Sequence, residues 1–128
     1  MEIVTKTGNG KWDSLGPYGN LEVVICGPRQ DRCCHISNLD NQNINDFERG
    51  QEDAFKGKAL QNCQSFKLPW LAYMHIMNMN SVGENDDGWG PLYMDVKFHN
   101  SSKLHCDLKK FGHVKNRKIV VTDMCVLQ

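Results

Sequence analysis

The stretch Leu21-Glu22-Val23-Val24-Ile25-Cys26 has the strongest strand character in this chain, because it places three β-branched residues side by side. The turn-forming sequences GPYGN at residues 16–20 and GP at residues 27–28 enclose it. A short apolar run between two such turns predicts a β-strand with at least one buried face. The rest of the sequence divides in the same way.

Similar runs recur on both sides of that strand, and several alternate between apolar and polar residues. Residues 71–79, for example, place Ala72, Met74 and Ile76 on one face. The predicted strands are Glu2–Thr7, Leu21–Cys26, Arg32–Ile36, Ala54–Leu60, Leu71–Met79, Tyr93–Phe98, Lys103–Leu108 and Lys118–Leu127. These eight short strands, without helical periodicity, predict an all-β sandwich or barrel formed by residues 1–128 as a single domain.

Six cysteines are spread along the chain without the CxxC pairs of a zinc site: Cys26, Cys33, Cys34, Cys63, Cys106 and Cys125. Their even number predicts three disulfides, typical of a secreted protein, rather than buried free thiols. Cys33 and Cys34 would point to opposite faces of a strand, so we expect different partners. The start lacks the features of a signal peptide, and secretion therefore implies that Met1 replaces a removed one.

Charge balance and missing motifs exclude several classes of function. The 15 Lys and Arg residues balance the 15 Asp and Glu residues, so no overall field attracts nucleic acid. No GxSxG, HExxH or Gly-rich phosphate motif occurs, which predicts a protein that is not an enzyme. The sequon at Asn100 is either a glycosylation site of a secreted protein or a chance triplet.

Residues 45–55, which read NDFERGQEDAF, closely resemble the signature of PLAT domains, N-x-F-E-R-G-x-x-D-x-F. The surroundings agree in order, with TG at 7–8, GPYGNL at 16–21, LDN at 39–41 and GW at 88–89. The resemblance spans residues 2–106 and implies an eight-stranded antiparallel β-sandwich. The cysteines are not part of the family pattern and indicate a secreted member.

The resemblance also implies a calcium site. In calcium-binding PLAT domains the positions of Asn45, Asp46 and Glu48 supply oxygen ligands, and Gly16 is placed to add a carbonyl. Ca²⁺ prefers six to eight hard oxygens, which two adjoining loops can supply. This sequence departs from the family pattern at Tyr18, where an Asp is expected, and so lacks one carboxylate.

Other interpretations of the acidic residues remain open. The signature loop could instead be metal-free and closed by an ion pair between Glu48 and Arg49. A second acidic stretch, ENDD at residues 84–87, is either a weak calcium loop or a solvated turn.

PLAT domains of lipases and lipoxygenases help to dock those enzymes on lipid surfaces or partner proteins, in several cases through exposed tryptophans. Trp12 and Trp70 are the candidates here, because a Trp at a loop tip suits a membrane interface. The alternative is that they belong to the core, as family analogy implies for Trp89.

One local basic cluster lies within residues 109–118 and contains Lys109, Lys110, Arg117 and Lys118. It could meet phosphate head groups or sulfated glycans, or it could be a solvated hairpin loop.

The resulting hypothesis is a secreted binding module that recognises a lipid surface or membrane protein through its loops, with calcium as the candidate cofactor. The alternatives are an extracellular effector, such as a venom or secretory-fluid component acting on a protein target, and a calcium-associated matrix protein. Nucleic acid is not an expected partner, and the oligomeric state is left open.

Overall fold

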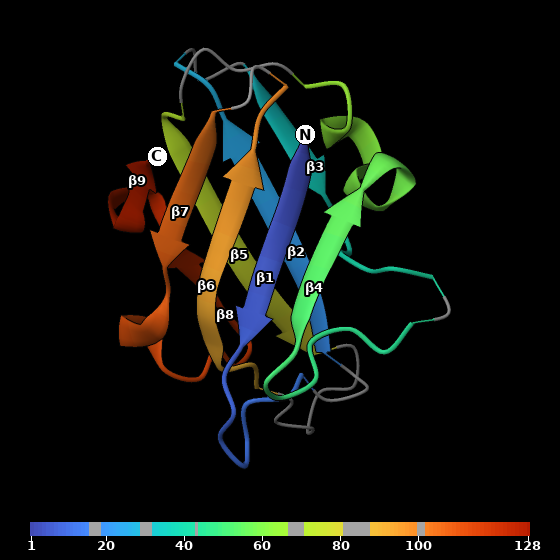
Figure 1. Cartoon of the computed structure of the whole chain (residues 1–128), viewed down its shortest axis with the longest axis vertical. Coiled ribbons are helices and arrows are strands. Elements are labelled where there is room, and N and C mark those ends of the chain that lie inside the picture. Colours follow the sequence, from blue (N-terminus) through green and yellow to red (C-terminus); the bar gives the residue numbers. More distant parts are fainter. Residues whose placement is uncertain (16–18, 29–31, 43, 67–70, 81–87, 100–101) are drawn as a thin grey trace.

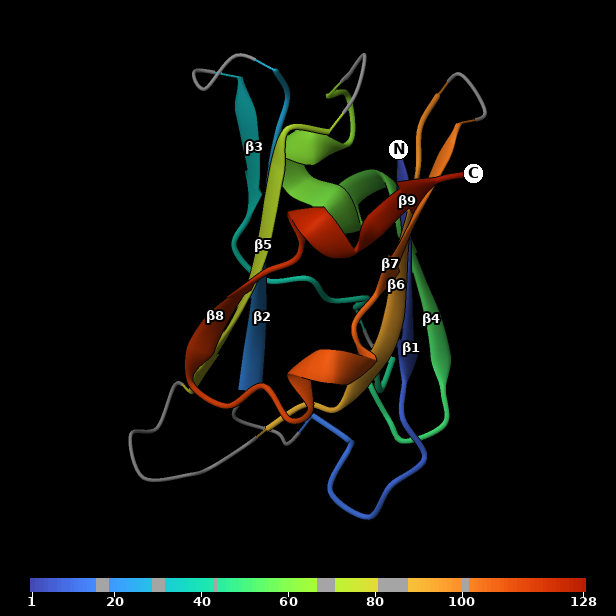
Figure 2. The same ribbon diagram turned by 90° about the vertical axis from the view of Figure 1, so that its left-hand side faces the viewer.

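The computed structural model describes residues 1–15, 19–28, 32–42, 44–66, 71–80, 88–99 and 102–128. Two antiparallel sheets pack face to face (Figures 1 and 2). The first has the order β4 (Glu52–Lys56), β1 (Glu2–Thr7), β6 (Pro91–Lys97), β7 (Lys103–Asp107), β9 (Cys125–Leu127). The second has the order β3 (Cys33–Ile36), β2 (Gly19–Cys26), β5 (Tyr73–Asn80), β8 (Arg117–Val120). This arrangement confirms the predicted β-sandwich.

Two of the predicted strands were wrong in extent. The run Ala54–Leu60 does not continue as a strand, because Gly57 adopts a φ of +59° and turns the chain into a 3-10 helix. The run Lys118–Leu127 is divided between the two sheets, so that β8 and β9 pair with β5 and β7 respectively. A continuous apolar run does not reveal such a change of sheet.

Three short 3-10 helices connect the strands within the described ranges: η1 (Gly57–Cys63), η2 (Lys109–Phe111) and η3 (Thr122–Met124). None of the helices in this part of the chain is long and apolar enough to cross a membrane.

The core lies between the sheets and is formed by alternate residues of the strands. Met74 and Ile76 of β5 are fully buried, as their alternation predicted, and so is Phe55 of β4. Ala72, predicted on the same face, precedes β5 and is exposed. Trp89 is also fully buried, and its indole Nε1 donates a hydrogen bond to Thr7 Oγ1 at 2.9 Å. The expected core position of Trp89 is therefore confirmed.

The signature loop is anchored to this core through Phe47. Its ring stacks on Phe55 and meets Trp89 edge-on, with ring centroids 5.4 Å apart in both pairs. The backbone at Phe47 has a φ of +63°, an uncommon conformation for a bulky residue. Its N–H donates to Asp53 Oδ2 at 2.8 Å, while the Gln51 side-chain amide donates to Asp53 Oδ1. The buried carboxylate of Asp53 thus holds the turn.

All six cysteines form disulfides, which pair Cys26 with Cys33, Cys34 with Cys63 and Cys106 with Cys125. Cys33 is exposed and Cys34 is buried, so the two neighbours face opposite sides of β3 and take different partners, as expected.

The three disulfides are expected to differ in their contribution to stability. Cys34 and Cys63 are buried and 29 residues apart, whereas Cys26 and Cys33 are 7 residues apart. Loop-closure entropy alone makes the longer link more stabilising by about 1 kcal/mol. We expect the Cys34→Ala/Cys63→Ala double variant to lose more unfolding free energy in guanidinium denaturation than Cys26→Ala/Cys33→Ala. Equal losses would contradict this order.

The Asp53→Asn substitution is expected to lower the free energy of unfolding by about 2 kcal/mol, the usual value of a hydrogen bond to a charged group. The side chain keeps its size, but the carboxylate that accepts the Phe47 N–H loses its charge. Chemical denaturation measures the change, with Asp123→Asn on the exposed helix η3 as the matched control. A loss no greater than that of the control would show that the carboxylate does not anchor the loop.

Candidate functional site

Trp12 lies in the connection between β1 and β2, at the lower end of the molecule in Figure 1. Its side chain is 71% exposed, the largest value among the exposed large hydrophobic residues of the described ranges. The Lys11 ammonium lies 5.2 Å from the centroid of its ring, within the range of a cation–π contact. The structure therefore places an apolar ring and a positive charge together in solvent.

Asp13 fixes the backbone beside Trp12. Its carboxylate accepts a hydrogen bond from Gly10 N at 2.7 Å and lies 2.7 Å from His113 Nε2. A Cβ added at Gly8 or Gly90 would come within 2.3 or 2.2 Å of the carboxylate oxygens, so only glycine leaves room for this side chain. Gly90 N also donates to the Asp13 carbonyl at 2.9 Å. These contacts thus hold the loop that carries Trp12 in a defined conformation.

The contact between Asp13 and His113 brings the basic segment to the same end of the molecule (Figures 1 and 2). A shallow pocket of about 230 Å³ lies where the two segments meet, and Lys109 lines it together with Asp13 and His113. Lys109 and Lys110 belong to η2 and are exposed. The structure therefore brings Lys109 to the loop that carries Trp12, and Lys110 follows Lys109 in η2. We call Trp12, Lys109 and Lys110 the Trp12 end.

The two other predicted cations have different surroundings. Arg117 donates from Nη2 to the carbonyls of Phe111 and His113 at 2.6 and 3.1 Å, so it closes the turn between η2 and β8. Lys118 lies on β8 opposite Met77. Arg117 therefore lies next to His113, which reaches the Trp12 end, but its Nη2 is bonded to backbone carbonyls.

A second pocket, of about 360 Å³, lies at the signature loop. Its lining includes the predicted ligands Asn45, Asp46 and Glu48, together with Asp40, which the sequence interpretation did not include. The exposed side chain of Ile44 also lines it. Carboxylate and amide oxygens are the donors that Ca²⁺ prefers, so the chemistry of the lining is suitable.

The geometry of these oxygens fits a metal only in part. Asp46 already accepts hydrogen bonds from Asn41, from the backbone N at 2.6 Å and from Nδ2 at 3.2 Å. Burial raises the pKa of the Asp46 carboxyl, the two bonds from Asn41 lower it, and the neighbouring Asp40 raises it. Within the described ranges, no three His, Cys, Asp or Glu side chains are grouped closely enough to hold a metal ion.

Several predicted features fall outside the described residues: Gly16 and Tyr18 at the calcium loop, Trp70, the acidic stretch 84–87 and the sequon at Asn100. The proposed ion pair between Glu48 and Arg49 does not form in the part of the chain that the structure describes. The backbone N–H of Arg49 donates to Ser14 Oγ at 2.7 Å and so ties the signature loop to the segment after Trp12.

The residues that sequence reasoning missed are mostly those that position others. The glycines at positions 8 and 10 indicate a tight turn, but no sequence pattern identifies Asp13 as the residue that holds it. His113 lies 100 residues away from Asp13 and has no local signal. Ile44 stands as one apolar residue within the polar sequence NQNIND, a signal that could have been noticed.

Comparison with known proteins extends the structural result. No protein-family model matches the chain, and no curated protein matches its sequence. Among solved structures, alpha toxin from Clostridium absonum matches with a TM-score of 0.67 and 19% identity, over 93% of this chain and 30% of the toxin. Coral 8R-lipoxygenase, described as activated by calcium via a C2-like domain, matches with a TM-score of 0.64 and 14% identity.

The lipoxygenase match covers 94% of this chain but 16% of the enzyme, so this chain spans only a minor part of either protein. Both matches extend over nearly the whole of this chain. At such low identities the likeness establishes the fold alone. The fold of this chain is the PLAT-type, C2-like β-sandwich that residues 45–55 indicated.

Proposed function

We propose that this chain is a secreted, non-catalytic binding module that docks on a lipid surface through its Trp12 end. The observation that carries the proposal is the exposure of Trp12 on a turn held by Asp13, beside the cations Lys109 and Lys110. A Trp ring with its polar N–H is suited to the boundary between head groups and acyl chains. The three disulfides support secretion.

The charges at this end suit an anionic lipid surface. Lys11 and Lys110 contact the rings of Trp12 and Phe111 respectively, so each cation accompanies an aromatic group. Each Lys near an anionic membrane contributes about 1 kcal/mol. Because the whole chain is neutral, this attraction depends on the local arrangement and is expected to be sensitive to salt.

Calcium is the proposed auxiliary ligand of the pocket lined by Asp40, Asn45, Asp46 and Glu48. Bound there, a divalent cation would neutralise Asp46, whose pKa is raised by burial and also by the neighbouring carboxyl of Asp40. The supply of oxygen donors supports the proposal, and so does the PLAT-like signature.

The Trp12→Ala variant is expected to bind anionic liposomes about tenfold more weakly in a co-flotation assay, because it loses a large exposed apolar side chain. Leu127→Ala is the matched control, since Leu127 is 66% exposed on β9 and outside the Trp12 end. Equal losses in the two variants would exclude specific docking through Trp12. Failure of the native protein to float under any condition, with saturable binding to cells, would favour the effector alternative.

The Lys109→Gln/Lys110→Gln variant is expected to bind anionic liposomes about thirtyfold more weakly, from about 1 kcal/mol for each lysine. The same variant should bind neutral liposomes as the native protein does. A comparable loss on neutral liposomes would mean that these lysines act through the fold rather than through lipid charge.

Glu48→Gln tests the role of calcium, because it removes one negative oxygen without altering the bonds between Asp46 and Asn41. In about millimolar Ca²⁺, a level that fills extracellular sites, the native protein is expected to float better than in chelator. The variant should lose this difference, while Asp123→Asn should retain it. Equal flotation of the native protein in calcium and in chelator would remove calcium from the proposal.

A further inference from the structure

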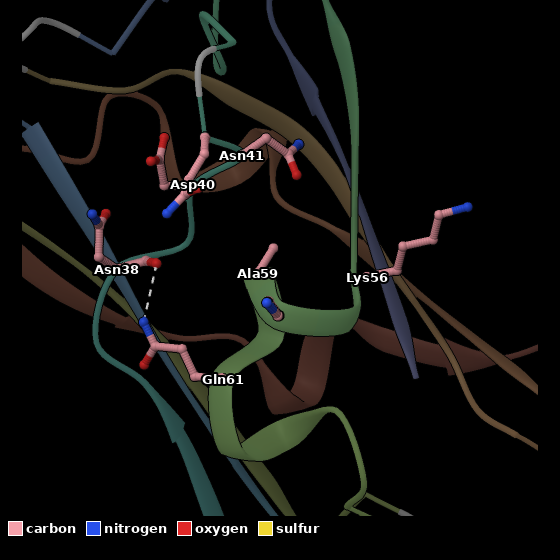
Figure 3. A pocket seen from close by; sticks show the side chains of 8 residues that line it. Asn38, Asp40, Asn41, Lys56, Ala59 and Gln61 are labelled. Carbon is pink, nitrogen blue, oxygen red and sulfur yellow. Dashed lines mark hydrogen bonds between the residues drawn. The ribbon is translucent and has the colours of Figure 1, made fainter.

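A third pocket, of about 460 Å³, lies between the segment after β3 and the start of η1 (Figure 3). Its lining is polar except for one alanine, and consists of Asn38, Asp40, Asn41, Gln42, Lys56, Lys58, Ala59 and Gln61. Residues with amide and charged side chains therefore line the cavity from two separate segments. The volume is within the range of small-molecule sites.

The walls of this pocket are tied together by bonds within the protein. The disulfide between Cys34 and Cys63 joins β3 to the end of η1. Gln61 Oε1 accepts hydrogen bonds from the N–H and the hydroxyl of Ser37 at 2.9 and 3.1 Å. Its Nε2 donates to the carbonyl of Asn38 at 3.4 Å, the dashed line in Figure 3. A ligand would meet a preformed cavity, which reduces the entropy lost on binding.

Gln61 also has an uncommon backbone conformation, with φ +50° and ψ −128°. A non-glycine residue held there costs roughly 1–3 kcal/mol and persists only where its surroundings enforce it. Such residues are concentrated at ligand sites. Here the conformation places an amide side chain in the wall of the cavity, where it bridges the two segments.

The charges across the pocket are arranged asymmetrically. Lys56 and Lys58 stand on one side, and no described carboxylate lies within ion-pair distance of either ammonium group. Asp40 stands on the other side, on the segment after β3 (Figure 3). The lining therefore includes two cations on the side of β4 and η1, one carboxylate on the other side, and amides. The side chain of Lys56 extends from the rim of the cavity, away from Asp40 (Figure 3).

We propose that this pocket binds an acidic sugar, a ring with several hydroxyls and a sulfate or carboxylate group. Side-chain amides can both donate to and accept from hydroxyls, and a carboxylate such as that of Asp40 accepts from them. Lys56 and Lys58 supply charge-assisted hydrogen bonds to the anionic group. Neutral amides alone would suit an uncharged sugar, so the two unpaired lysines decide in favour of an acidic one.

This site is separate from the Trp12 end. The pocket lies at the upper end of the molecule in Figure 1, where β4 leads into η1. Trp12 belongs to the connection that follows β1 at the lower end. The pocket does share Asn38 and Asp40 with the proposed calcium pocket, so calcium held by Asp40 would compete with the sugar. The inference therefore goes beyond lipid docking through Trp12 and is independent of that residue.

Calorimetric titration with a heparin-derived tetrasaccharide tests the proposal. The Lys56→Gln/Lys58→Gln variant is expected to bind at least tenfold more weakly than the native protein. Lys109→Gln/Lys110→Gln removes the same charge at the Trp12 end and should weaken the binding less than the pocket variant does. Equal weakening in both variants, or absence of binding to the native protein, would overturn the proposal.

Asn38→Ala separates a shaped site from simple charge attraction, because it removes a polar lining group and leaves the net charge unchanged. We expect at least threefold weaker binding of the tetrasaccharide, and loss of binding when the sulfate groups are removed from the sugar. Unchanged affinity in Asn38→Ala would overturn the acidic-sugar site. Thermal unfolding and liposome flotation should stay native in the Lys56→Gln/Lys58→Gln variant, which distinguishes this result from misfolding and from failure of lipid docking.

Discussion

The buried carboxylate of Asp53 holds the signature loop, and both the pocket around Asp46 and the turn that carries Trp12 depend on that loop. It accepts the N–H of Phe47 and so holds that residue in a positive-φ conformation, with its ring packed into the core. The carbonyl of Phe47 then accepts the N–H of Leu15, and Gly50 N donates to the carbonyl of Gly8. Both sides of the Trp12 turn are therefore bonded to the signature loop. Asp53, a residue that is only 6% exposed, thus helps to set the position of the exposed indole of Trp12.

The strands and the signature loop could be predicted because their signals are local. Alternation along β5 identified its buried face, and the neighbours Cys33 and Cys34 had to face opposite ways. The pairing of Asp13 with His113 could not be predicted, because the two residues meet only after the sheets are assembled. The division of the last run between β8 and β9 likewise depends on packing. Local patterns thus predicted which segments form strands, while the sites depend on contacts between distant segments.

The neutral net charge conceals a separation of charges over the surface. Carboxylates gather around Asp46, cations extend along η2, and the pocket beside η1 contains both signs. The Debye length in physiological salt is about 8 Å, so exposed groups farther apart than this act nearly independently. The neutral composition therefore gives no overall attraction to nucleic acid but allows three local environments, two of which share Asp40. A sandwich permits this because its loops project at both ends of a rigid scaffold.

The disulfides hold the short edge strands of this sandwich in place. Cys26 and Cys33 are paired residues of β2 and β3, and Cys106 and Cys125 are paired residues of β7 and β9. Both β3 and β9 are edge strands, of only four and three residues. Short edge strands have few hydrogen bonds to hold them, and an edge that opens exposes backbone groups to pairing with other chains. Covalent links at two edges, and a third from β3 to η1, stabilise the parts of the fold that backbone bonding holds least. The third link, between Cys34 and Cys63, also fixes the wall of the pocket beside η1, so the disulfide that secures the edge strand β3 supports a rigid binding surface.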